Sequence, residues 1–268
     1  MKALRPVVAA ALVLFAASAA QAHKSWLLPS ATVLTADQWI TVDAAVSNDL
    51  FYFNHVPIRL DNLEITAPDG SAVKPENPFT GKFRSSFDLH LDKPGTYKMA
   101  LVNNGVFASY ELNGEKKRWR GKPDDMAKDI PADAKNVEIT QSAGRIETFA
   151  TAGAPNDTAL KATGKGLEMT PVTHPNDLFA GETAKFRFTL DGKPAVDLAV
   201  EVVPGGSRWR NAQNEIALKT DKNGEISVTW PAAGMYWLET SLQDKNATVP
   251  KATSRRASYV ATFEVLAQ

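Results

Sequence analysis

The chain has 268 residues, of which 44% are hydrophobic, and its 30 lysines and arginines equal its 30 aspartates and glutamates. A formal net charge of zero argues against a broad basic surface for nucleic acid or for an anionic membrane. The absence of cysteine excludes a disulfide framework and a thiolate metal site. Stability must therefore come from ordinary hydrophobic cores.

The first 22 residues have the pattern of a secretory signal peptide. Lys2 and Arg5 precede a short uncharged apolar run, and Ala20-Gln21-Ala22 forms a small-residue cleavage site. The run is too short to span a membrane. We predict cleavage between Ala22 and His23, with a cut after Ala20 as the alternative. The mature chain has no other long apolar stretch, so we expect a periplasmic protein without membrane insertion.

The rest of the chain has mostly the alternating pattern of half-buried strands. Apolar and polar residues alternate over residues 39–46 and 83–91, and again over 184–190 and 224–230. The strand at 83–91 is followed by Lys93-Pro94-Gly95 and a second apolar stretch, which predicts a hairpin. Helical periodicity occurs only around residues 123–130, and it is short.

A weak internal repeat suggests the domain count. KPGTYKMAL (residues 93–101) and PAAGMYWLE (residues 231–239) each place a Pro and then Gly-x-Tyr before an apolar strand. Between them, residues 151–166 are rich in Ala, Thr and Gly, as in a linker. We predict an all-β fold of two tandem β-sandwich domains, at 23–150 and 167–268. A single larger β-structure is the alternative.

The four histidines, His23, His55, His90 and His174, are the candidate ligands of a transition metal in a chain without cysteine. If His23 is the first mature residue, its α-amine and imidazole Nδ1 can chelate one ion together. The ordinary pKa values of these groups are about 8 and 6.5, so neutral or mildly basic conditions favour binding. Nitrogen donors suit Ni(II), Co(II), Cu(II) or Zn(II). The alternative is that cleavage happens to leave a histidine there.

The other three histidines have weaker signals. His55 follows three aromatic residues, Phe51 to Phe53, which could exclude water around a ligand; the alternative is a surface loop. His90 shares a strand face with Asp88, which could orient its ring, or both lie on a solvated face. His174 lies in the second predicted domain and reaches the others only across a domain interface, so a structural role is its alternative.

No compact metal-ligand spacing, no G-x-S-x-G elbow and no Gly-rich phosphate loop occurs in the sequence. Two basic segments, at residues 113–123 and 204–213, each contain Arg-Trp-Arg. Such a segment could dock a partner or an anionic group, or it could be an exposed basic hairpin.

Several segments resemble a known family. AHKSWLLPS (residues 22–30), KPGTY (93–97), residues 167–203 and TDKNGEISVTWPAAGMYWLE (220–239) are similar to periplasmic components of cobalt/nickel ABC transport systems. The resemblance covers essentially the whole mature chain. It implies immunoglobulin-like β-sandwich domains and a protein that handles nickel or cobalt near a membrane transporter. The family's mature N-terminal histidine corresponds to His23, and its neighbouring aromatic residue to Trp26.

The sequence therefore predicts a periplasmic metal-binding protein rather than an enzyme. His23 would chelate Ni, Co or Cu, internal histidines such as His55 and His90 would complete the site, and a membrane metal transporter or an outer-membrane receptor would be the partner. One alternative is a metal-free interaction module. Another is an oxidative enzyme that holds copper between an N-terminal histidine and a second imidazole, which rests on analogy of fold and donor set alone.

Overall fold

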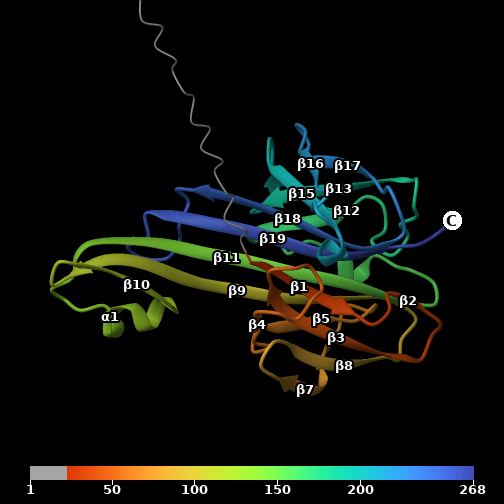
Figure 1. Ribbon diagram of the computed structural model, residues 1–268, viewed down its shortest axis with the longest axis horizontal. Coiled ribbons are helices and arrows are strands. Elements are labelled where there is room, and N and C mark those ends of the chain that lie inside the picture. Colours follow the sequence, from red (N-terminus) through yellow and green to blue (C-terminus); the bar gives the residue numbers. More distant parts are fainter. Residues whose placement is uncertain (1–22) are drawn as a thin grey trace, which may run out of the picture.

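The computed structural model describes residues 23–268, and the predicted signal peptide lies outside this range. The fold is all-β, as the sequence predicts, with β-strands gathered in three sheets (Figure 1). The helical segments of the described range are short: η1 (Pro123–Asp125), α1 (Met126–Asp129), η2 (Thr158–Leu160) and η3 (Ser207–Trp209). The first two confirm the short helix predicted at 123–130. None of the helices in residues 23–268 has the length and apolar character needed to cross a membrane.

The largest sheet has ten strands and draws on both halves of the chain. Along the sheet the order is β16 (Ile216–Lys219), β15 (Ala199–Pro204), β18 (Gly234–Asp244), β19 (Ser254–Val265), β11 (Lys135–Ala152), β9 (Gly95–Leu112), β5 (Leu63–Thr66) and β6 (Ala72–Val73), with β10 (Glu115–Gly121) paired to β9 and β2 (Val33–Leu34) paired to β11. The halves join where β11 and β19 pair in parallel, Thr140 to Thr148 against Ser254 to Thr262.

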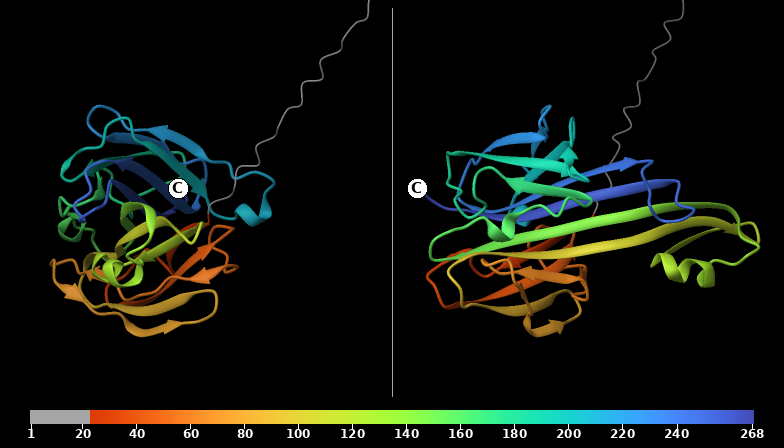
Figure 2. Two further views of the ribbon diagram at one scale, coloured as in Figure 1. Left: turned by 90° about the vertical axis from the view of Figure 1, so that its left-hand side faces the viewer. Right: turned by 180° about the vertical axis from the view of Figure 1, so that it is seen from behind.

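Two smaller sheets cover the opposite faces of the ten-stranded sheet (Figure 2). The first contains β1 (Lys24–Pro29), β3 (Gln38–Ser47), β8 (Ser85–Leu91) and β7 (Glu76–Thr80), with β4 (Val56–Pro57) paired to β3. The second contains β12 (Leu167–Pro171), β13 (Thr183–Leu190) and β14 (Lys193–Pro194), with β17 (Glu225–Thr229) paired to β13. The protein thus has three layers, and the middle layer belongs to two sandwiches.

The alternation of side chains along the shared strands explains how one sheet serves two cores. On β11, Ile146 and Ala150 belong to the core under the five-stranded sheet, whereas Phe149 belongs to the core under the four-stranded sheet. On β19, Val260 and Tyr259 divide in the same way. Successive side chains of a strand point to opposite faces, so a strand buried on both faces must be apolar on both.

The predicted hairpin between residues 83–91 and 96–102 is wrong, because the two strands lie in different sheets. β8 pairs with β3 and β7, and β9 pairs with β11, β5 and β10. The turn between them carries the chain from one layer to the next. Gly95 has a φ of 127°, and a Cβ there would meet Pro68 at 2.5 Å. The short turn therefore crosses the edge of the sandwich, from one sheet to the other, instead of joining two paired strands of one sheet.

The repeated Gly-x-Tyr is the tyrosine corner typical of immunoglobulin-like sandwiches. The Tyr97 hydroxyl accepts a bond from the Lys93 amide at 2.8 Å, and burial raises the pKa of this phenol to about 12. The Tyr236 hydroxyl donates to the Ala232 carbonyl at 2.8 Å, in the turn between β17 and β18. Each tyrosine therefore fixes one inter-sheet turn in its own half.

The predicted linker, residues 151–166, begins within β11, which ends at Ala152, and the rest of it is held against the protein at several points. Ala159 and Leu160 of η2 are buried. The Glu168 carboxylate accepts bonds from the backbone amides of Thr163 and Gly164, at 2.9 and 2.7 Å. These contacts limit the freedom of the predicted linker.

A buried ionic network lies where β11, β19 and β12 meet. The Arg145 guanidinium donates to Glu147 at 3.2 Å and lies 3.6 Å from the Glu168 carboxylate. The Tyr259 hydroxyl, fully buried, donates to Glu147 at 2.7 Å. Burial, together with the Glu147 carboxylate, raises the pKa of this phenol well above its ordinary value. The network ties together strands from both halves of the chain.

The long strands β9 and β11 extend past the sandwich and form, with β10, a projecting arm at residues 106–139 (Figures 1 and 2). One face of the arm is covered, because Val106, Ala108 and Ile139 pack with Trp119 and with Met126 of α1. The first Arg-Trp-Arg thus lies on β10, with its tryptophan turned toward this small core.

Candidate functional site

His23 and His55 lie side by side, although 32 positions separate them in the sequence. β1 begins next to His23 and β4 begins next to His55, and both strands pair with β3 near its end, Lys24 opposite Ser47 and Val56 opposite Val46. The two imidazole rings are stacked, with 3.9 Å between ring centroids and 12° between ring planes. The end of β3 therefore brings both rings to one place.

The start of β1 is fixed by residues from the second half of the chain. The Lys24 ammonium lies 3.1 Å from the Glu201 carboxylate and 4.3 Å from the centroid of the Trp237 ring. The Trp237 indole donates to the Ser25 carbonyl at 2.9 Å. These positioning residues were missed in the sequence, because nothing in its pattern links residues more than 170 positions apart.

The loop that presents His55 is closed by the side chain before it. The Asn54 amide oxygen accepts from the Asn48 amide at 2.9 Å, and its nitrogen donates to Asp49, also at 2.9 Å. Ser47 donates to the Asp49 carbonyl and accepts from the Trp26 indole. The loop is thereby joined to β1, which carries His23.

Phe51 holds a strained backbone conformation in this loop, with a φ of 60°. A bulky residue in the left-handed region costs on the order of 1–3 kcal/mol and persists only where the surroundings enforce it. Its ring packs edge-on against Trp26, 5.6 Å between centroids, and a Cβ added at Gly205 would lie 3.1 Å from it. The absence of a side chain at Gly205 makes room for Phe51.

The three aromatic residues Phe51 to Phe53, which could exclude water around a ligand, lie in two different environments. Phe51 and Phe53 pack against Trp26, whereas Tyr52 is 40% exposed. The second Arg-Trp-Arg segment lies beside Tyr52, and the Arg208 guanidinium covers the Tyr52 ring at 3.8 Å. Trp209 is 81% exposed. A small polar cavity of about 150 Å³ lies between the two loops, lined by residues that include Lys24, Asn48, Asp49, Ser207 and Arg210.

His90 lies apart from this pair. It is opposite Trp39 on β3, and their rings stack at 4.5 Å. Trp39 and Ser47 are eight residues apart, or about 27 Å along a strand. The His90 Nε2 lies 2.7 Å from Asp37, not from the predicted partner Asp88.

Asp88 has other partners. Its carboxylate accepts from the Thr41 hydroxyl at 2.7 Å and from the Asn77 amide at 3.0 Å. These hydrogen bonds lower the pKa of Asp88. Asp88 and His90 therefore share a strand face without a contact that orients the ring.

His174 lies beyond the far end of β1, and both of its ring nitrogens are engaged. Nδ1 accepts from the Asn176 amide at 3.2 Å, so Nε2 carries the proton and donates to the Thr96 hydroxyl at 2.9 Å. Thr96 in turn bonds Thr151, which donates to the Asn176 side chain. This network joins β9, β11 and the β12–β13 loop, and it requires neutral His174.

The pH dependence of stability should report this requirement. Burial lowers the pKa of His174, although Asp157 and Asp177 act in the opposite direction. Between pH about 6.5 and the lowered pKa, the unfolded chain therefore binds the proton and the folded chain does not. We expect stability to fall as the pH drops from 6.5 toward the lowered pKa, by at most about 1.4 kcal/mol per pH unit from this group. Thermal unfolding from pH 7.5 to 5 should show less of this loss in His174→Gln.

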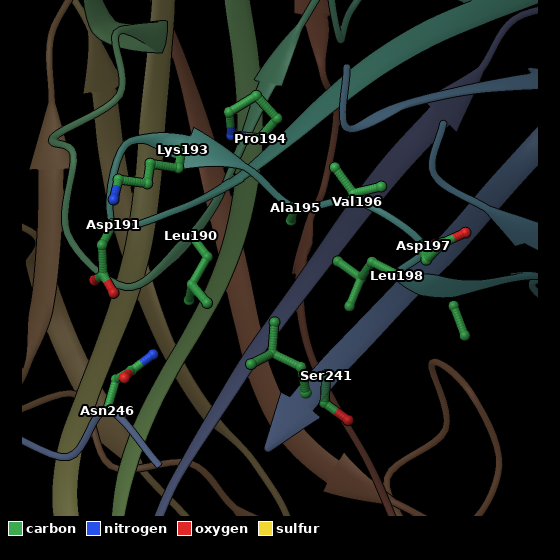
Figure 3. A pocket seen from close by; sticks show the side chains of 12 residues that line it. Leu190, Asp191, Lys193, Pro194, Ala195, Val196, Asp197, Leu198, Ser241 and Asn246 are labelled. Carbon is green, nitrogen blue, oxygen red and sulfur yellow. The ribbon is translucent and has the colours of Figure 1, made fainter. Parts of the chain in front are cut away.

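A second cavity, of about 520 Å³, has none of the four histidines in its lining (Figure 3). Its lining includes Leu190, Leu198 and Leu242 together with two aspartates. Asp191 lies 2.7 Å from Arg255, and Asp197 lies 2.9 Å from Lys219. Because both carboxylates already contact a cation and no histidine reaches this cavity, we place the candidate site at His23 and His55 instead.

The His23–His55 pair offers two imidazoles at the protein surface. Within residues 23–268, no three or more side chains of His, Cys, Asp and Glu are grouped so that they could hold a metal ion. Two imidazoles fit a borderline transition metal, and a third donor must come from elsewhere. The α-amine that cleavage before His23 would create is such a donor.

Comparisons with solved structures return immunoglobulin-like and adhesin chains at low similarity. The D0–D1 domain of intimin is 13% identical, covering 88% of this chain and 96% of its own, with a TM-score of 0.21. The Escherichia coli adhesin FdeC is 12% identical over 89% of this chain and 65% of its own, with a TM-score of 0.22. A titin fragment, A168–A169, is 11% identical over 92% and 98%, with a TM-score of 0.21.

No curated protein matches the sequence. A family model described as a domain of unknown function, DUF4198, matches residues 20–244. This match includes both candidate histidines, His23 and His55, and both tyrosine corners. The chain therefore belongs to the DUF4198 family.

Proposed function

We propose that the protein binds a transition-metal ion through His23 and His55. The observation that carries the proposal is the stacking of their rings at 3.9 Å, at the end of a strand that both flanking segments share. Metal–imidazole bonds are about 2.0–2.1 Å long. A rotation of the two side chains can turn one nitrogen of each ring toward a common ion, and His23 is exposed and has room for it.

The α-amine of His23 would be the third nitrogen donor. Cleavage after Ala22 places the amine and Nδ1 of one residue on the same ion, closing a chelate ring. The contacts of Lys24 and Ser25 with Glu201 and Trp237 hold the next two residues, so the chelate needs little further ordering. Three nitrogens suit Ni(II), Co(II) and Cu(II) better than Mg(II) or Ca(II).

We further propose a role in periplasmic nickel or cobalt uptake, with the ion passed to a membrane transporter or received from an outer-membrane receptor. The resemblance to periplasmic components of cobalt/nickel transport systems supports this role. Binding and transfer require no catalytic turnover. A copper-loaded protein should therefore not consume peroxide or reductant faster than free copper does.

Titration calorimetry on two forms of the protein tests the proposal. One form begins at His23, verified by mass spectrometry, and the other carries one extra residue before it. We expect Ni(II) and Cu(II) affinity to fall at least about tenfold in the extended form, because the chelate ring is lost. Equal affinities would remove the terminal amine from the site.

A metal-free interaction module is the second candidate, and the exposed Trp209 favours it. The residue is 81% exposed, and the Arg208 guanidinium lies near both its ring and that of Tyr52. Tryptophan, tyrosine and arginine are enriched at the centres of protein interfaces. Metal analysis of protein purified from the periplasm separates the two candidates, since a module of this kind would carry no stoichiometric metal.

A further inference from the structure

The uncovered face of the projecting arm carries a row of cations. Lys116, Arg118 and Arg120 are exposed and alternate along β10, so their side chains point to one face at intervals of about 7 Å. Lys135 on β11 pairs with Glu111, which itself pairs with Lys116, and thus lies on the same face. We call these four residues the basic row.

The face that carries the basic row has more positive than negative side chains. Within residues 23–268, none of the four forms an ion pair, whereas Lys117, on the other face of β10, pairs with Glu115. Two carboxylates, Glu111 and Glu138, share the face, and Glu111 accepts a bond from Asn136 at 2.9 Å. The face remains positive even though the whole chain is neutral.

An exposed aromatic ring lies within the row. Phe107 is opposite Arg120 on β9 and is 40% exposed, and the Arg120 guanidinium lies 5.0 Å from its ring centroid. Aromatic rings beside cations are favoured at the boundary between lipid headgroups and acyl chains.

The charges of the arm are also divided between its two faces. The opposite face is covered by the segment that contains α1, in which Asp124, Asp125 and Asp129 outnumber Lys122 and Lys128. A basic uncovered face and an acidic covering segment give the arm one preferred orientation toward a negative surface.

We propose that the basic row docks the protein on an anionic phospholipid surface. The row is an open strand face on an arm that projects from the sandwich (Figure 2), so several cations can reach a flat surface together. A fluid surface can supply a phosphate to each cation whatever their spacing, and each cation near it contributes about 1 kcal/mol. The proposal does not depend on metal binding.

Flotation with phosphatidylglycerol–phosphatidylcholine vesicles tests the proposal. We expect the mature protein to bind these vesicles at low salt, to bind pure phosphatidylcholine vesicles much more weakly, and to dissociate as salt rises. The triple variant K116E/R118E/R120E should lose affinity for the mixed vesicles by roughly a hundredfold or more, from three cations at about 1 kcal/mol each. A matched variant, K161E/K165E/K222E, changes the net charge equally on the sandwich and should bind nearly as the parent does.

Three outcomes would overturn the proposal. The first is equal loss in both triple variants, which would make binding a matter of net charge. The second is capture on immobilised polyglutamate without vesicle binding, which would indicate an acidic protein partner. The third is unchanged vesicle binding in K116E/R118E/R120E. If that variant then self-associates in gel filtration, the row serves to protect the open edge of β10.

Discussion

Replacing Arg145 with methionine is expected to lower the free energy of unfolding by about 3–5 kcal/mol. The side chains of Glu147 and Glu168 are almost fully buried and face this one guanidinium. Methionine fills a similar volume but leaves two carboxylates in a region of low dielectric without a counter-charge. Urea denaturation followed by tryptophan fluorescence would measure the loss.

Arg187→Met is the control for this change. Arg187 also pairs with a glutamate, Glu225 on the neighbouring strand, but its side chain is 49% exposed. An exposed pair contributes less than about 1 kcal/mol, so Arg187→Met should stay within that range. A loss of similar size in the two variants would show that the buried network contributes no more than a surface pair.

Replacing His55 with alanine in protein that begins at His23 should weaken Ni(II) and Cu(II) binding at least about tenfold. The variant removes one of the three nitrogens and keeps the amine–imidazole chelate. His55 is partly exposed at the end of a surface loop, so the fold should be unaffected. Calorimetry at pH 7.5 is the measurement.

His90→Ala and His174→Gln are the matched controls for His55. Each removes one imidazole, yet His90 lies about 27 Å along β3 from the site and both ring nitrogens of His174 are engaged. Both variants should keep the parent affinity within about twofold. If His90→Ala weakened binding as much as His55→Ala, the dominant ion would be held at the far end of β3.

The alternating pattern of the strands could be predicted from the sequence, because it depends only on which residues two positions apart are apolar. The alternation in residues 39–46 and 184–190 follows from local burial, and β3 and β13 confirm it. Which strands pair was not predicted correctly. A short turn such as Lys93-Pro94-Gly95 can close a hairpin or cross between layers. Which of the two forms depends on the strands with which each flanking strand pairs.

For the candidate site, the available donors could be read from the amino-acid sequence alone: it contains four histidines and no cysteine, and its predicted leader would be cut before His23. Which of these donors lie close together depends on strand pairing. His55 joins His23 because β1 and β4 pair with the same end of β3, and His90 is carried away because β8 pairs with the other end. Such pairings join residues far apart in the chain, and local patterns carry no information about them.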